Sequence, residues 1–262
     1  MLLIDLCSLD SVRAFADKFE EEVERLDILV QNAAVVSMKY ELTEDEWETS
    51  LQVNHIAPAL LILLLLPKMF KAAEMTTSHP RIVIVASELH QYGKIPDKAI
   101  QATSALEVLN NKELCEPYVH LDRYNLAKLL NVFFTLGLTD RLPSVHPTVI
   151  ANSVNPGFCY SDLRRDMQSI FVRIIELLLA RSAEEGARQV IWGAVATPPE
   201  SQGGVNSLRG AYVSLAKIEE PSDFVISEKG NQFKQILWDD TVKTLSKVDP
   251  RVQPIVERYL QK

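Results

Sequence analysis

Short apolar runs alternate along the chain with longer stretches in which apolar residues recur at spacings of three and four. Five runs have the length of strands; they are residues 2–6, 28–30, 81–86, 149–154 and 210–213. The run at 81–86 is apolar on both faces, as in a parallel strand that is covered on both sides. Strands that alternate with helices predict a parallel sheet with helices on both faces.

Helix starts are marked by polar residues that can cap them. Ser8 precedes an apolar stripe that continues to Leu26. Capping boxes predict two further starts, and their residues are Thr43 with Glu46 and Ser182 with Glu185. Besides the helix at 8–26, the pattern predicts helices over residues 47–70, 121–138, 185–194 and 233–260. A polar loop of about thirty residues follows residue 86, and a loop that long is usually a lid or an insertion.

The length and composition fit one folded unit. The chain has 262 residues, of which 47% are hydrophobic and 24% are charged, as in ordinary globular proteins. We find no internal repeat, linker or low-complexity segment, so we assign residues 1–262 to a single domain.

Charge and metal-ligand spacing exclude several classes of partner. The formal net charge is −8 and no basic cluster stands out, so we expect neither nucleic acid nor an anionic membrane surface as a partner. The three cysteines are far apart and the five histidines lack a metal-ligand spacing, so we expect no disulfide framework and no metal site. A reducing, cytoplasmic location is the expectation.

The most apolar run, residues 57–66, is too short to span a membrane. The N-terminus has no basic start followed by a long apolar core, so we do not expect a signal peptide. Residues 60–66 would suit a homodimer interface or burial against the sheet, and the sequence leaves both alternatives open.

Tyr124 and Lys128 are the central chemical signal. Their spacing of four places both side chains on one face of a predicted helix. An ammonium beside a phenol favours tyrosinate and lowers the pKa of the phenol from about 10. Such a tyrosine can exchange a proton with an alcohol near neutral pH.

Further polar or small residues follow the predicted parallel strands. Ser87 follows the run at 81–86, Asn32 with Ala33 and Ala34 follows 28–30, and Asn155-Pro156-Gly157 follows 149–154. Ligands bind beyond the carboxyl ends of such strands. The sequence therefore predicts one site where these residues meet Tyr124 and Lys128.

At this point the chain resembles the classical short-chain dehydrogenase/reductase family. The resemblance rests on Gln31–Ala34, Asn54, the set Ser87, Tyr124 and Lys128, and Pro156-Gly157 with Ser161. Asp5 resembles the acidic residue that ends the family's third strand. The sequences RGAYVS at 209–214 and EPSDFV at 220–225 are similar to those of a fungal, retinol-dehydrogenase-like branch of this family. The resemblance implies a Rossmann-like, doubly wound parallel sheet in three α/β/α layers.

The resemblance also implies roles for these residues. Tyr124 would donate or accept the proton, Ser87 would orient the carbonyl oxygen, and Asn54 would hold a relay water. Lys128 would lower the pKa of the phenol and bind the nicotinamide ribose. The residues implied to bind the cofactor, NADP in preference to NAD, are Asp5, Asn32, Ala33, Tyr124, Lys128, Pro156, Gly157 and Ser161.

The sequence departs from the family in one respect. The family opens with a strand, a glycine-rich turn and a helix, and no G-x-x-x-G-x-G occurs here. Those glycines let a pyrophosphate approach a helix N-terminus, so we expect the 262-residue chain to bind NAD(P) weakly. Without the first βαβ unit, residues 2–6 would stand about 14 Å from residues 28–30 and lack a strand partner.

Two functions remain in competition. The first is an NAD(P)-dependent oxidoreductase that interconverts an alcohol and a ketone or aldehyde, in secondary metabolism. The second is a non-catalytic protein that binds a partner. A serine hydrolase is disfavoured because Ser87 lies in Ala-Ser-Glu rather than G-x-S-x-G. By resemblance, residues 91–118 and 162–179 would form the substrate pocket, and the apolar residues of the second stretch point to a hydrophobic substrate.

Overall fold

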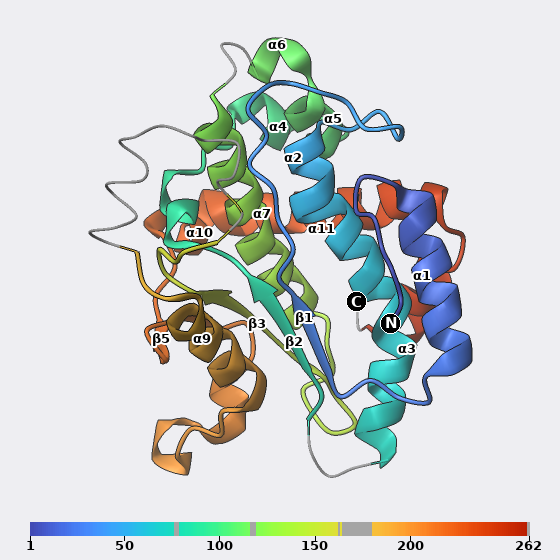
Figure 1. Ribbon diagram of the computed structural model, residues 1–262, viewed down its shortest axis with the longest axis vertical. Coiled ribbons are helices and arrows are strands. Elements are labelled where there is room, and N and C mark those ends of the chain that lie inside the picture. The colour runs from blue at the N-terminus through green and yellow to red at the C-terminus, as the bar shows by residue number, and fades with distance from the viewer. Residues whose placement is uncertain (76–78, 116–118, 162, 164–179, 261–262) are drawn as a thin grey trace.

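Five strands form one sheet at the centre of the molecule (Figure 1). The computed structural model describes residues 1–75, 79–115, 119–161, 163 and 180–260. The strands lie in sequence order, and they are β1 (Ile28–Gln31), β2 (Arg81–Val85), β3 (Ile150–Asn155), β4 (Tyr212–Ser214) and β5 (Lys217–Glu219). β1 to β4 are parallel, and β5 pairs antiparallel with β4. The predicted α/β class is therefore confirmed, and β5 is a strand that the apolar pattern did not predict.

Helices cover the sheet in two unequal layers. On one side, α3 (Ala57–Met75) and α7 (His120–Thr139) pack against the sheet. α1 (Leu9–Glu22) and α12 (Val252–Tyr259) pack on α3, α11 (Glu228–Val248) packs on α7, and all five helices contribute to the larger core. A smaller core joins α9 (Ala183–Val195) to the other face through Val83, Ile150 and Val154. The sheet is thus covered on both sides, which explains why β2 and β3 are buried at every residue.

Short elements connect these layers. They are α2 (Thr49–Leu51), the π-helix η1 (Gln52–Ile56), the 3-10 helices η2 (Glu88–Tyr92), η4 (Glu200–Gln202) and η5 (Gly204–Leu208), and the α-helices α4 (Asp97–Gln101), α5 (Ala105–Asn110), α6 (Lys112–Cys115) and α10 (Asp223–Ile226). The loop expected after residue 86 therefore contains η2, α4, α5 and α6.

The apolar helix α3 belongs to the core. Residues 60–66 are each at most 6% exposed, so the structure shows burial within the chain for this run. The stretch Thr49–Met75 is long and apolar enough to cross a membrane, but 89% of its most apolar window is buried inside the protein. A buried helix of a globular core explains that composition without a membrane.

Two of the predicted helix starts are confirmed and one is wrong. Ser8 caps α1, and Ser182 with Glu185 forms a capping box at α9. Thr43 and Glu46 do not open a helix, because the helical hydrogen bonds begin six residues after Thr43 and Glu46 has a positive φ of 63°. The carboxylate of Glu48 caps α2 instead, accepting from the backbone N–H groups of Ser50 and Leu51.

The predicted C-terminal helix at 233–260 is two helices. α11 begins earlier, at Glu228, and ends at Val248, and α12 begins at Val252. Pro250 cannot donate a helical hydrogen bond, and the carboxylate of Asp249 accepts from the backbone N–H of Arg251. Both features end α11 at this point.

Residues 2–6 do not form a strand, which corrects the first prediction. Leu3 is 81% exposed, and this segment has no ladder with any strand of the sheet. β1 pairs on one side only, and Ile28 and Val30 are 43% and 39% exposed. Within the part of the chain that the structure describes, no strand lies beside this segment, and β1 forms an edge of the sheet.

Candidate functional site

The carboxyl ends of three adjacent parallel strands bring the predicted site residues to one edge of the sheet. Asn32 follows β1, Ser87 follows β2 by two residues, and Pro156 follows β3. Asn32 and Ala33 are exposed, and Ser87 is half-buried. A ligand at this edge would therefore meet all three turns.

Helix α7 brings Tyr124 and Lys128 to the same edge. The ammonium of Lys128 lies 5.4 Å from the centroid of the Tyr124 ring. Lys128 Nζ donates a 2.6 Å hydrogen bond to the carbonyl oxygen of Val85, the last residue of β2. Lys128 therefore contacts the end of the strand that Ser87 follows, and Tyr124 lies beside Lys128 on the same helix.

Burial changes the acidity of Lys128. Its side chain is enclosed by the core, and desolvation lowers the pKa of the ammonium from 10.5 to about 8. The group therefore remains mainly protonated at pH 7. It can stabilise a negative charge that develops on the Tyr124 oxygen.

The turn that carries Ser87 packs tightly on α7. Ser87 Oγ caps η2 by accepting from the backbone N–H of Leu89 at 3.2 Å. At the far end of η2, a Cβ on Gly93 would come within 2.8 Å of Asn125 O and Leu129 Cβ. Only glycine permits so close an approach, so η2 and α7 are fixed against each other.

His90 supports Ser87 from within the protein. Its Nδ1 lies 2.7 Å from Ser87 O, and its Nε2 accepts from the backbone N–H of Ser222 at 3.0 Å. These partners require the neutral ring with the proton on Nδ1. Burial lowers the pKa of His90, which favours that neutral form. Sequence reasoning missed His90, because only the fold brings Ser222 to its ring.

Asn54 holds the turn after β1. It lies in the π-helix η1, where such local distortions often accompany functional sites. Its Oδ1 accepts from Val35 N at 2.8 Å and its Nδ2 donates to Val35 O at 2.9 Å. The side chain therefore fixes the backbone beside Asn32 and Ala33, and its role toward a relay water stays a prediction.

The turn after β3 is shaped by its own asparagine. Asn155 Oδ1 accepts from Gly157 N at 3.0 Å, and Gly157 has a φ of +82°, which favours glycine. Ser161 is exposed four residues further on. Of the expected pocket walls, residues 116–118, 162 and 164–179 lie outside the described residues.

Asp5 does not join this group. It lies in the turn before α1, where its Oδ1 accepts from the backbone N–H of Cys7 at 2.8 Å. No strand carries it to the carboxyl edge of the sheet, because residues 2–6 are not part of the sheet. Its role toward a cofactor stays a prediction.

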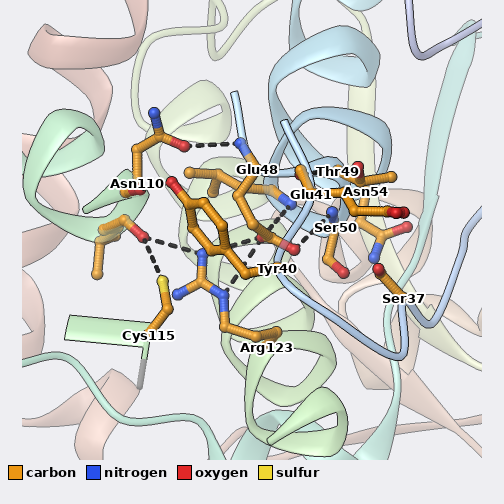
Figure 2. Close-up of polar contacts among 12 residues, drawn as sticks. Ser37, Tyr40, Glu41, Glu48, Thr49, Ser50, Asn54, Asn110, Cys115 and Arg123 are labelled. Atoms are coloured by element: carbon orange, nitrogen blue, oxygen red, sulfur yellow. Dashed lines mark hydrogen bonds and ion pairs between the residues drawn. The ribbon is translucent and has the colours of Figure 1, made fainter. Parts of the chain in front are cut away.

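A buried polar cluster beside Tyr124 was not predicted from the sequence (Figure 2). Glu48 and Arg123 form an ion pair at its centre, and Tyr40 and Asn110 lie next to them. The one local signal was the position of Arg123 directly before Tyr124. Its partner is 75 residues away in the sequence, so spacing alone could not identify the pair.

A family model matches the first part of the chain, and curated relatives match almost all of it. The family model described as short chain dehydrogenase matches residues 1–102. The short chain dehydrogenase/reductase dmxR8 of Cryptosporiopsis is 32% identical over 249 residues, which cover 95% of this chain and 74% of that protein. The short chain dehydrogenase yanD of Aspergillus niger is 31% identical and covers 94% of this chain and 72% of its own length.

Solved structures show the same fold. An uncharacterised protein from Mycobacterium paratuberculosis matches with a TM-score of 0.64 and 25% identity, over 93% of this chain and 74% of that chain. An NADPH-bound carbonyl reductase from chicken fatty liver matches with a TM-score of 0.53 and 16% identity, over 80% and 72% of the two chains.

Proposed function

The chain belongs to the short-chain dehydrogenase/reductase family of oxidoreductases, and on this premise we propose that it interconverts an alcohol and a ketone or aldehyde. The observation that carries the proposal is the shared position of Tyr124, Lys128 and Ser87 at the end of β2. A phenol, an ammonium and a hydroxyl in this arrangement supply an acid, a charge and an oxygen ligand.

In this proposal Tyr124 transfers the proton. The phenol gives a proton to the carbonyl oxygen during reduction and takes it back during oxidation. Lys128 stabilises the phenolate by its charge, and Ser87 donates a hydrogen bond to the reacting oxygen. A nicotinamide cofactor, when bound, supplies or accepts the hydride.

The residues at the sheet edge fit the nicotinamide-ribose half of such a cofactor. An ammonium has three N–H donors, and Val85 O accepts one from Lys128, so the group keeps the capacity to bind ribose hydroxyls. The exposed residues Asn32 and Ala33 and the positive-φ turn at Gly157 leave room for a ligand at this edge. We propose NADP in preference to NAD.

The substrate is a small molecule, and we propose that it is hydrophobic. The support is the set of apolar residues within 162–179, a stretch that follows Ser161 directly in the sequence. We also propose a cytoplasmic location, a place in secondary metabolism and a homodimer. A panel of lipophilic and small polar ketones tests the substrate class, because turnover of the polar ketones alone would contradict it.

The competing proposal is a non-catalytic protein that binds a partner. It is supported by the absence of a G-x-x-x-G-x-G motif from the sequence. The retention of Asn54, Ser87, Tyr124 and Lys128 together favours the enzyme.

Substitution of Tyr124 separates the two. We expect Tyr124→Phe to lower kcat/KM by about 10²- to 10⁴-fold, because it removes the proton donor and little else. The measurement is NADPH oxidation with the ketone panel, and circular dichroism checks the fold. Tyr259→Phe is the matched control, since that phenol lies at the end of α12 and stacks on Phe70. Activity that survives Tyr124→Phe would exclude this assignment.

A further inference from the structure

A buried ion pair lies one residue before Tyr124 and takes no part in the proposed chemistry. Arg123 Nη2 and Nε lie 3.0 Å and 3.3 Å from Glu48 Oε2. The two side chains are 9% and 0% exposed, and Figure 2 shows the guanidinium directed at the carboxylate. Taking two charges out of water is costly, so a buried pair adds little net stability over apolar residues of similar volume. Stability alone therefore does not account for the pair.

Glu48 controls the segment that holds the turn after β1. Its two carboxylate oxygens accept from Ser50 N and Leu51 N, each at 3.0 Å. These bonds set the first turn of the continuous helix formed by α2, η1 and α3. Asn54 stands six residues further on and binds both backbone groups of Val35. Glu48 and the segment that contains Asn32 and Ala33 are therefore linked through the first turns of this helix.

Arg123 controls the start of α7. The N-cap residue of this helix, Val119, makes no side-chain capping hydrogen bond. Arg123 Nη2 also donates to Leu109 O at 2.9 Å, which ties the start of α7 to α5. Lys128, one turn beyond Tyr124, is fixed to β2 through Val85 O. Tyr124 therefore lies between two attachments of the same helix.

Asn110 closes the network on the side of α5. Its Oδ1 accepts from Glu48 N at 2.7 Å, and its backbone oxygen accepts from the Tyr40 hydroxyl at 2.9 Å. The residues around the ion pair thus connect the segment after β1, the start of α2, the end of α5 and the start of α7 (Figure 2). Three of these elements carry or hold residues of the candidate site.

We propose that Glu48 and Arg123 are positioning residues that hold Tyr124 in register with Lys128 and with the turn at Asn32. The inference rests on the proposed function for its catalytic consequence. Without the pair, α7 would lose its attachments to Glu48 and to Leu109 O next to Tyr124, while Lys128 stays bound to β2. The phenol would then move relative to the ammonium, and a small displacement of a catalytic group lowers the rate strongly.

The test replaces both charges together, because removal of one partner would leave the other buried and uncompensated. The variant is Glu48→Met with Arg123→Met in the full chain. The control is Asp249→Asn with Arg251→Met, which removes an ion pair at the junction of α11 and α12 whose carboxylate is buried and whose guanidinium is partly exposed. Two measurements are made on each: kcat and KM for the best ketone of the panel, and the ionisation of the Tyr124 phenol. The ionisation is followed by absorbance at tyrosinate wavelengths as pH is raised. For each protein, the same titration of a version that also carries Tyr124→Phe is subtracted, so that the difference reports Tyr124 alone.

We expect the double variant to lose about 100-fold in kcat while KM changes by less than about threefold. The ionisation midpoint of Tyr124 should rise, because Lys128 and the phenol titrate as a coupled pair while they lie side by side and as separate groups when they do not. The control should change neither value. If the double variant loses stability as the control does but keeps kcat and the midpoint, the pair is only structural and the proposal is overturned.

The titration keeps this inference separate from the proposed function. If the wild-type chain turns over no carbonyl compound, the proposed function fails, and the titration alone decides whether the pair positions Tyr124. If the double variant does not fold, Arg123→Lys takes its place, since it keeps the charge of the pair but cannot bind Glu48 and Leu109 O through one guanidinium. A smaller upward shift supports the proposal, and an unchanged midpoint overturns it.

Discussion

His55 and Lys128 show how burial sets the charge of a side chain in this protein. Both are enclosed by the core, and desolvation lowers the pKa of each, to about 4 for His55 and to about 8 for Lys128. At pH 7, His55 is therefore neutral and Lys128 remains mainly charged. The same physical cause thus gives one buried group without charge and one that can act on a phenol.

The low pKa of His55 predicts how stability depends on pH. The unfolded histidine titrates near 6.5 and the folded one near 4. As pH falls from 7 to 4, His55 binds a proton in the unfolded state but stays neutral in the folded state. The free energy of unfolding therefore decreases across this window and levels off below it. The loss attributable to His55 is about 3 kcal/mol.

Urea unfolding of wild type and His55→Gln between pH 7 and pH 4 measures this loss. Glutamine can keep a contact with Asn131, whose Oδ1 lies 3.3 Å from His55 Nδ1, but it does not titrate. We expect the difference in unfolding free energy between the two proteins to change steadily over this range. His146→Gln, at an exposed position, is the control, and a pH-independent difference for His55→Gln would contradict the assignment.

Helix α9 shows how an element is placed by the absence of a side chain. A Cβ on Gly193 would come within 2.6 Å of Val154 Cγ2 and 2.9 Å of Asn152 Oδ1. Asn152 also donates from its Nδ2 to Gly193 O at 2.9 Å. The glycine therefore lets α9 lie directly on β3, where the smaller core forms.

Gly193→Ala should destabilise the protein although alanine is the better helix former. The gain in helix propensity is about 1 kcal/mol, whereas forcing a methyl group into a packed core costs about 1–3 kcal/mol and here also disturbs the Asn152 hydrogen bond. Chemical denaturation measures the change. Arg188→Ala, on the exposed face of the same helix, should stay within about 0.5 kcal/mol. A stabilised Gly193→Ala variant would show that α9 is not pressed against the sheet.

At the scale of the whole molecule, the described residues offer a dinucleotide the edge of the sheet at the carboxyl ends of β1, β2 and β3. The candidate site offers Lys128, the turn at Asn32 and the turn at Gly157 for one half of a cofactor. No glycine-rich turn is present in the sequence to receive a pyrophosphate. Binding energy from the second half of the molecule should therefore be small.

We accordingly expect the 262-residue chain to bind NADPH more weakly than micromolar. Titration of the purified chain, followed by nicotinamide fluorescence, measures the affinity, with urea-unfolded chain as the control for non-specific signal. NADH titrated in the same way tests the preference for NADP. A micromolar dissociation constant would show that other residues bind the pyrophosphate.

Local chemistry determined much of this protein in advance. The apolar runs at 81–86 and 149–154 predict β2 and β3, because strands buried on both faces need uninterrupted apolar residues. The run at 28–30 predicts β1, although this strand is partly exposed at the edge of the sheet. Ser8 and Ser182 identify two helix starts, since a hydroxyl satisfies free N–H groups wherever the rest of the chain lies. Helical geometry alone places Tyr124 and Lys128 on one face.

Only the tertiary structure decided the features that depend on a distant partner. Residues 2–6 have the composition of a strand but form none, because a strand needs a neighbour for its backbone hydrogen bonds. Thr43 with Glu46 has the pattern of a capping box, yet Glu48 caps the helix, and its carboxylate is also paired with Arg123, 75 residues away. The contact of His90 with Ser222 likewise arises between segments far apart in sequence. Such contacts depend on how the layers pack, and no local spacing records them.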